Sequence, residues 1–330
     1  DKVTLTQNTG VADPETISTT SGWNPYFEMF ASLDLSKNSE VLLWRSYAKT
    51  GSYSITHGAP AWVQSGSNNG LLKTYVESFL MKDGMPWYAA TTSAPYMGDK
   101  TLDDVKTNRD DRLQLFVFSE SNFLPVHSQQ TAGTVQYFMP HPVSNRQEMQ
   151  DRTGYRLRKY ASFDLTQNVW GKAESTTGCI IFRGVEAYLN YMEAYYLKNG
   201  RIDGKAANYW RAVRERAGVE DVADGYTTDL EKFMGEVRRE RAVELAYEGH
   251  RFNDLRRWKL LTEYPYNIKT KQLFDRAEAF DPKDEPKERK VINFREEVVT
   301  ERKLTSKHYW LPFKTSDVTM YPEFYQNPGW

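Results

Sequence analysis

The sequence predicts a mainly α-helical fold, in which tetratricopeptide-like helical hairpins carry long loops and a few short strands. Three observations support this prediction. Residues 179–219 hold two helical patterns separated by Gly200, residues 228–259 begin with a capping box, and residues 49–69 have the Gly, Ser, Thr, Asn and Pro content of a surface loop. With 330 residues, the chain is long enough for a large core and for one or two domains.

Composition narrows the classes of function. The formal net charge of −1 creates no overall field that would favour nucleic acid or an acidic membrane. No apolar run approaches the ~18 residues that a membrane-spanning helix needs. Cys179 is the single cysteine, which excludes an intrachain disulfide, and we expect this thiol to be buried as a small hydrophobe.

The first half of the chain is expected to alternate loops with short elements. Apolar residues at helical spacing, from Leu72 to Phe79, define one buried face of a helix that Gly84 and Pro86 end. The apolar and aromatic content of residues 113–118 predicts a strand. The other expected elements are a short helix with aromatic anchors near residue 30 and a strand or extended segment at 40–47.

Two helices are expected at 179–200 and 204–219, each with a glycine just past its last turn. Small side chains let such helices approach while aromatic rings fill the gaps, which is typical of a tetratricopeptide hairpin. A single unit of this kind would be unstable on its own. The side chains expected to face one another are Ala187, Tyr191, Ala194 and Tyr195 on the first helix, and Ala206, Tyr209, Trp210 and Val213 on the second.

The stretch 228–259 places charges where a core should be. Its apolar stripe, Leu230, Phe233, Met234 and Val237, continues at helical spacing into Arg241, Glu244, Leu245 and Glu248. An unpaired buried charge costs roughly 3–5 kcal/mol, so these side chains must be paired. The spacing predicts a structural ion network in which Arg241 pairs with Glu244 and Glu248 pairs with Arg251.

Two further segments are expected to face solvent. Arg156, Arg158 and Lys159 form a charge run of the kind that usually lies on a solvated face. Residues 258–301 are polar and charged and are interpreted as a loop, which could include a helix near 270–279.

Several segments of the sequence resemble segments that are typical of one known family. RRERAVELAYEGHRFNDLRRW at 238–258 resembles the helix signature of the SusD/RagB family, the nutrient-binding surface lipoproteins of Bacteroidetes. NRDDRLQLFVF at 108–118 resembles a family turn, with Asp111 where proline is usual, and TGYRLRKY at 153–160 resembles another family segment. The closing YWLPFKTSDVTMYPEFYQNPGW resembles the family's terminal pattern, so the resemblance runs with gaps from about residue 70 to the end.

The resemblance implies an organisation as well as a fold. Residues 1–330 would form a single SusD-like C-terminal region, with a tetratricopeptide-like core at 179–260 and variable, ligand-facing loops at 45–110. Family members carry an export signal, a lipid-modified cysteine and a helical region ahead of the matched part, and we expect these to precede Asp1 in the whole protein. The resemblance then implies a protein anchored by lipid to the extracellular face of the outer membrane.

The motifs of several enzyme classes are not found in the sequence. It contains no dinucleotide or phosphate-binding loop, nucleophile elbow or HExxH motif, and its five histidines are scattered. Glu244 and Glu248 could form a glycosidase carboxylate pair, but the surrounding arginines favour an ion network with both groups ionised. Asp103, Asp104, Asp110 and Asp111 could hold Ca²⁺, yet their spacing fits no fixed loop, so solvated surface positions, and no cofactor or metal, are expected.

Aromatic residues are the best indication of a ligand. They make up 14% of the chain, and sugar rings rest on Trp and Tyr while amide groups bind the hydroxyls. Each of these rings could instead be packed in the core or against a loop. The expected ligand-binding residues are Trp62, Trp87, Tyr88 and Tyr96, with Asn69 and Asn108.

The resemblance and these rings lead to one preferred function. The chain would be a non-catalytic binding protein that captures oligosaccharides and passes them to a SusC-like TonB-dependent transporter. Two alternatives stay open: the same scaffold could bind peptides, or the protein could be a glycoside hydrolase that uses Glu244 and Glu248.

Overall fold

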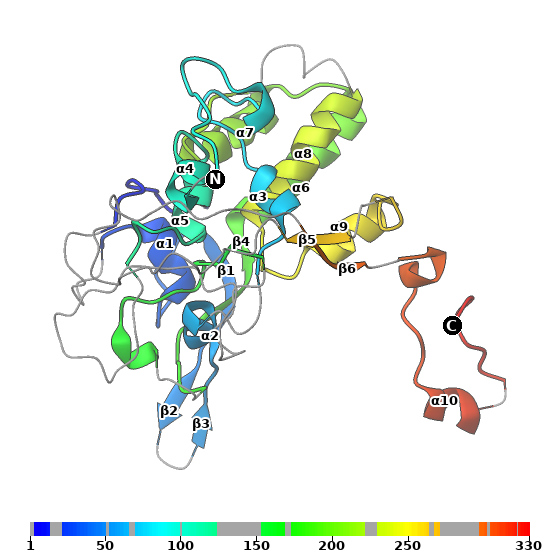
Figure 1. The fold of residues 1–330 in the computed structure, drawn as a ribbon. Coiled ribbons are helices and arrows are strands. Elements are labelled where there is room, and N and C mark those ends of the chain that lie inside the picture. Colours follow the sequence, from blue (N-terminus) through cyan, green and yellow to red (C-terminus); the bar gives the residue numbers. More distant parts are fainter. Residues whose placement is uncertain are drawn as a thin grey trace.

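A computed structural model shows a mainly helical fold with a few short strands, as the sequence predicted (Figure 1). The helices α6, α7 and α8 lie together on one side, and α1, β1 and α2 lie on the other. The residues that the structure describes are 3–13, 22–50, 53–65, 70–99, 101–123, 153–168, 173–221, 230–263, 267–270, 297–301, 304–321 and 323–330.

The α-helices range from one turn to about four turns. Short 3-10 turns lie at Met29–Ala31, Trp87–Ala89 (η2), Leu165–Gln167 and Ser306–Tyr309. The α-helices are α1 (Pro25–Glu28), α2 (Ala59–Ser65), α3 (Lys73–Glu77), α4 (Leu102–Lys106), α5 (Asp111–Phe116), α6 (Gly184–Asn199), α7 (Gly204–Arg216), α8 (Leu230–Glu244), α9 (Arg251–Arg257) and α10 (Thr315–Met320).

The strands of the described residues form three separate antiparallel pairs. In the pair β1–β4, Val41 lies opposite Arg183 and Arg45 lies opposite Cys179, with two irregularities in register. Cys179 is exposed in this pair, so the expectation that its thiol is buried was wrong. The pairs are β1 (Val41–Arg45) with β4 (Cys179–Arg183), β2 (Ala48–Thr50) with β3 (Tyr53–Ile55), and β5 (Asn267–Thr270) with β6 (Glu297–Glu301).

The helices α6 and α7 form the predicted hairpin, and Gly200 and Gly218 adopt positive φ angles after their last turns. The predicted start of the first helix was wrong, because residues 179–183 form strand β4 and α6 begins at Gly184. The rings of Tyr188 and Tyr209 stack across the hairpin with centroids 3.8 Å apart. The buried face of α6 is turned by one residue from the expected one, because Tyr188 and Met192 are buried while Tyr191 is 40% exposed. The third helix, α8, adds Phe233, Met234 and Val237 to this core.

The stretch 228–259, whose helical spacing was expected to continue through Arg251, is divided into two helices. Helix α8 ends at Glu244, and Tyr247 and Gly249 then take positive φ angles of 61° and 86° before α9 begins. Positive φ angles are incompatible with a continuing right-handed helix, so the chain turns here and α9 takes a new direction. Thr228 and Asp229 of the predicted capping box lie outside the described residues.

The strand predicted at 113–118 was wrong, because residues 111–116 form helix α5. The carboxylate of Asp110 accepts a hydrogen bond from the amide of Arg112 at 2.9 Å and so caps the helix. Apolar residues cannot by themselves separate a short buried strand from a short buried helix. The rings of Phe116 and Phe118 join Tyr26, Phe27 and Phe30 in the other main core cluster.

The basic segment around residue 158 is buried, which contradicts the expected solvated face. Arg156, Arg158 and Lys159 are each no more than 4% exposed. Arg158 pairs with Asp13 at 2.7 Å and lies against the ring of Phe27. Arg158 and Lys159, which pairs with Glu248 at 2.6 Å, thus pack their stems in the core while their charges are paired.

Two remaining predictions concern a helix near 270–279 and the absence of membrane-spanning helices. The helix considered at 270–279 lies outside the described residues, apart from Thr270, which ends β5. Within the described ranges, none of the helices combines the length and apolar character that crossing a membrane requires.

Candidate functional site

Three of the four predicted ligand-binding rings gather in one loop. Trp87 begins the turn η2, and its ring lies 5.9 Å from Tyr88 and 5.4 Å from Tyr96, measured between centroids. Tyr88 is 75% exposed, whereas Trp87 and Tyr96 are half-buried. The loop therefore exposes the ring of Tyr88 beside the half-buried rings of Trp87 and Tyr96. We call Trp87, Tyr88 and Tyr96 the aromatic cluster.

Short-range hydrogen bonds fix the loop that carries the aromatic cluster. The amide of Met81 donates to the carbonyl of Met85 at 2.8 Å, around Gly84 with its φ angle of 78°. The carboxylate of Asp83 accepts from the amide of Met85 at 3.0 Å and from the hydroxyl of Thr91. Because both ends of the loop are held, the rings are presented without a large ordering cost on binding.

Asn108 supports the cluster from the neighbouring turn. Its Nδ2 donates to the carbonyl of Pro95 at 2.9 Å, next to Tyr96. Asn108 itself has a φ angle of 60°, a conformation that Asn adopts more readily than most residues. Its amide nitrogen thus holds the loop, which is a positioning role beside the expected contact with ligand.

Burial raises the pKa of Tyr96 to about 12, and the charge of Asp99 acts in the same direction. The phenol is therefore protonated at neutral pH and keeps an O–H group that can donate a hydrogen bond.

Trp62 lies on a different surface. It belongs to α2, is 63% exposed, and its ring lies over Gly58. Figure 1 shows α2 near the β2–β3 hairpin and below α1, away from α4. The predicted set of rings is therefore not one site, and Asn69 lies outside the described residues.

Glu244 lies at the centre of a buried cluster of charges. Its carboxylate pairs with Arg112 at 3.0 Å, Arg183 at 2.8 Å and Arg216 at 2.7 Å, and the hydroxyl of Tyr26 donates to it at 3.0 Å. Burial opposes ionisation of Glu244, but the charges of these guanidinium groups outweigh it and hold its pKa well below the usual range.

Glu248 is held in the same way. It pairs with Lys159 at 2.6 Å and with Arg183 at 2.8 Å. Burial again opposes ionisation, and the charges of Arg183 and Lys159 lower the pKa of Glu248 to about 2. The cluster also includes the buried residues Glu40, Asp110, Arg214 and Glu240.

The ion pairs differ from those expected within the helix. Arg241 donates to Asp254 at 3.0 Å and to Asn190 at 2.7 Å, and Arg251 reaches the carbonyl of Arg238 at 3.4 Å. The break after α8 explains the difference for residues beyond Glu244, because helical spacing no longer applies there. The partners of Glu244 come from α5, β4 and α7, which no local spacing could reveal.

This electrostatic environment does not suit acid catalysis. The acid of a glycosidase pair needs a raised pKa, whereas the pKa values of Glu244 and Glu248 are both lowered. Their oxygens already accept hydrogen bonds from several buried donors. The arrangement fits a role in holding α5, α7 and α8 together.

The four aspartates considered for calcium are engaged separately. Asp104 completes a capping box with Thr101, and Asp103 accepts from Ser121 at 2.6 Å. Asp110 binds Arg112, and Asp111 pairs with Lys82. Asp110 and Asp111 are buried, in contrast to the expected solvated positions. Among the described residues, no group of three or more His, Cys, Asp or Glu side chains could hold a metal ion.

Comparison with known proteins supplies the context for this geometry. A family model described as the SusD family matches residues 30–330. No match was found among curated proteins.

Three solved structures illustrate the similarity in fold. A SusD-like protein from Bacteroides fragilis is 21% identical with a TM-score of 0.69, covering 99% of this chain and 59% of that one. A SusD-like carbohydrate-binding protein from the same species is 20% identical with a TM-score of 0.57, covering 87% and 54%. A SusD superfamily protein from Parabacteroides distasonis is 17% identical with a TM-score of 0.51, covering 92% and 53%. The chain thus spans between half and three-fifths of these structures.

Proposed function

The chain belongs to the SusD family, and on this premise we propose that it captures oligosaccharides at the outer face of a bacterial outer membrane. It passes them, chemically unchanged, to a SusC-like TonB-dependent transporter. The SusD family is a family of non-catalytic binding proteins. One similar structure is described as a carbohydrate-binding protein, which supports saccharides as the class of ligand.

The aromatic cluster is the observation that carries the proposal. Tyr88 offers an exposed ring face, the Trp87 ring lies 5.9 Å from it between centroids, and the Tyr96 ring lies 5.4 Å from Trp87 on the same loop. A sugar presents C–H groups on one face and hydroxyls at its edge, so a ring with polar neighbours suits it. The hydroxyls of Thr91, Ser93 and Tyr96 lie on the same loop, close to the rings in sequence.

A binding site of this kind needs no catalytic group. The buried carboxylates Glu244 and Glu248 have lowered pKa values, and each forms ion pairs with at least two basic side chains. A bound glycan is therefore expected to keep its chain length during long incubation, which chromatography of the recovered saccharide would measure. Shortening of the glycan by the purified protein would contradict the proposal.

Alanine variants of the aromatic cluster test the site. If sugar stacking resembles the stacking of bases on aromatic rings, Trp87→Ala and Tyr88→Ala should each lose about 1–3 kcal/mol of binding free energy for a saccharide that the parent binds. Tyr325→Ala is the matched control, because Tyr325 is 82% exposed and lies far along the chain in the C-terminal segment. Unchanged saccharide affinity in both cluster variants would show that the saccharide binds elsewhere.

The transfer step is tested separately. Co-purification of the whole protein from native outer membranes should recover a TonB-dependent transporter in stoichiometric amount. Repeated recovery without such a transporter would contradict the transfer step while leaving saccharide capture intact.

A further inference from the structure

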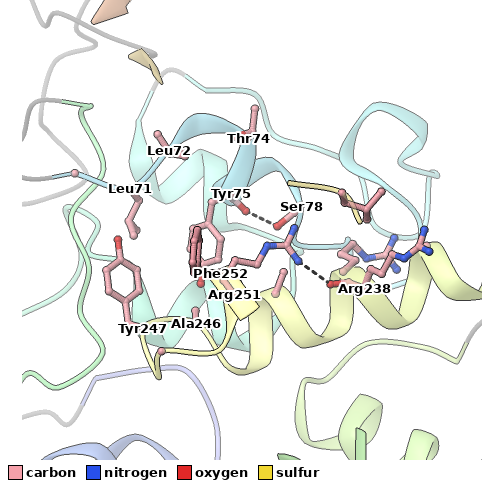
Figure 2. Close-up of a pocket in the computed structure, with 16 residues that line it drawn as sticks. Leu71, Leu72, Thr74, Tyr75, Ser78, Arg238, Ala246, Tyr247, Arg251 and Phe252 are labelled. Atoms are coloured by element: carbon pink, nitrogen blue, oxygen red, sulfur yellow. Dashed lines mark hydrogen bonds between the residues drawn. The ribbon is translucent and has the colours of Figure 1, made fainter. Parts of the chain in front are cut away.

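A groove lies apart from the aromatic cluster, between α3 on one side and α8 and α9 on the other (Figure 2). Its volume is about 660 Å³, within the range of pockets that hold small ligands. It shares no residue with the aromatic cluster. No local sequence pattern indicates this groove, because its two sides are about 160 residues apart in the chain.

Small residues of α8 and of the turn that follows it line the groove. Gly235 and Ala242 lie two helical turns apart on α8, and Ala246 lies in the turn after Glu244. A Cβ atom placed on Gly235 would meet no atom within 4 Å, so the space above this glycine is open. Tyr75 and Leu72 come from the α3 side, Tyr247 comes from the turn after α8, and Phe252 comes from α9.

The groove combines positive charge with aromatic rings. Arg238, Arg239 and Arg251 line it, and no acidic side chain of the described residues does. Arg239 pairs with Glu236 outside the lining, whereas the described contact of the Arg238 guanidinium is the ring of Trp258 at 5.8 Å. Figure 2 shows the side chain of Arg251 extending between Tyr75 and α8.

The rings in the groove are open to a ligand. Tyr247 is 56% exposed and Phe252 is 43% exposed. Tyr247 is fixed in its unusual backbone conformation by the hydroxyl of Tyr160, which donates to its carbonyl at 2.9 Å. An occupant with an anionic group and a ring would thus meet guanidinium donors and a ring face together.

We propose that this groove is a second binding site, which takes a saccharide unit carrying a carboxylate or sulfate group. The anionic group binds between Arg238 and Arg251, and the sugar ring lies against Phe252 and Tyr247. The inference rests on the proposed function in taking saccharides as the ligand class. It adds a second site and a charge preference to that function.

Calorimetric titration of the 330-residue chain with matched saccharides tests the inference. The probes are a galacturonate trimer for carboxylate, a chondroitin sulfate oligosaccharide for sulfate, and a neutral galactose trimer. We expect at least one acidic probe to bind about tenfold more tightly than the neutral one, and salt to weaken its binding. Equal affinity for all three probes, or no binding of either acidic probe, overturns the inference.

Two groove variants locate the binding. Arg238→Gln removes one charge, and Gly235→Leu places a side chain in the groove at a position where the added Cβ meets no atom within 4 Å. Each should lower the affinity for the acidic probe about tenfold or more, with a melting temperature close to that of the parent. Unchanged affinity in a folded Gly235→Leu protein overturns the inference.

Trp87→Ala separates this inference from the proposed function. Loss of all saccharide binding in Trp87→Ala, with no effect of the groove variants, leaves the proposed function standing and the second site refuted. Loss of acidic-probe binding in the groove variants alone, with no effect of Trp87→Ala on any probe, supports the second site and contradicts the aromatic cluster. Failure of every saccharide to bind contradicts both.

Discussion

The carboxylate of Glu244 forms ion pairs with three arginines that come from three different elements, α5, β4 and α7. A buried cluster of this kind contributes little net stability compared with an apolar core, yet removing one member leaves its partners uncompensated. Removal of Glu244 is therefore expected to lower the free energy of unfolding. Denaturation of a variant measures this loss directly.

Glu244→Gln is expected to lower the free energy of unfolding by roughly 3–5 kcal/mol, because buried guanidinium groups would lose their shared counter-charge. Urea denaturation followed by circular dichroism measures this change. Glu231→Gln is the matched control, since Glu231 is exposed on the same helix and should change stability by no more than about 0.5 kcal/mol. Similar small effects in both variants would show that the buried cluster is not structural.

Glu248 should make stability depend on acid pH. Its pKa is lowered from 4.5 to about 2 in the folded chain, so its stabilising contribution is complete above pH 4.5 and is lost as the pH falls toward 2. Glu248→Gln removes this contribution at neutral pH. Between pH 4.5 and pH 2, stability of the variant should therefore fall less steeply than that of the parent. Parallel acid-denaturation curves would contradict the assigned pKa shift.

The burial of these charges could be predicted from sequence, but their partners could not. The apolar stripe from Phe233 to Val237 leads directly to Glu244, so its inward position follows from helical spacing. Arg112 and Arg183 lie 132 and 61 residues away from it, and only the fold brings them together. For the same reason, the charge run at 156–159 gave no local sign that it is buried.

Among the helices and strands, most differences between the expected and the observed structure arise where a helix begins or ends. Residues 113–118 have strand-like composition, yet the cap at Asp110 and the contacts of α5 produce a helix. The helical spacing expected to run through Arg251 breaks where Gly249 allows a positive φ angle, although an isolated glycine in a helical pattern is usually tolerated. The hairpin α6–α7 was predictable because its glycines lie just past each helix.

The two hairpin glycines provide a matched pair of substitutions. Gly200→Ala should cost about 1–2 kcal/mol, the strain of a positive φ angle in a non-glycine residue, because nothing lies within 4 Å of the new Cβ. Gly218→Ala should cost more, since its Cβ would lie 2.5 Å from Asp111 Oδ2 and 2.8 Å from Lys82 Nζ. Thermal denaturation of the two variants compares them. A larger loss for Gly200→Ala would contradict the packing described at the end of α7.

At the scale of the whole molecule, the fold separates rings that the sequence suggested as one group. The segment after α3 carries Trp87, Tyr88 and Tyr96, whereas α2 carries Trp62 near the β2–β3 hairpin. Short separation in sequence brought the first three together, so they could be predicted as a cluster. The position of Trp62 depends on the strands that precede α2, and no pattern in the sequence revealed it.

This separation predicts different effects of two tryptophan substitutions. Trp87→Ala should weaken saccharide binding, whereas Trp62→Ala should leave saccharide affinity within about twofold of the parent. Titration of both variants with one saccharide makes the comparison. A larger loss in Trp62→Ala would move the binding surface to α2.

The most direct test of the proposed function is calorimetric titration of the chain against a panel of plant and host glycans and a peptide digest. We expect saturable binding of at least one glycan class at micromolar to millimolar strength, and weaker binding in Trp87→Ala and Tyr88→Ala. Binding of peptides alone, or glycan binding that is unchanged in both variants, would contradict it.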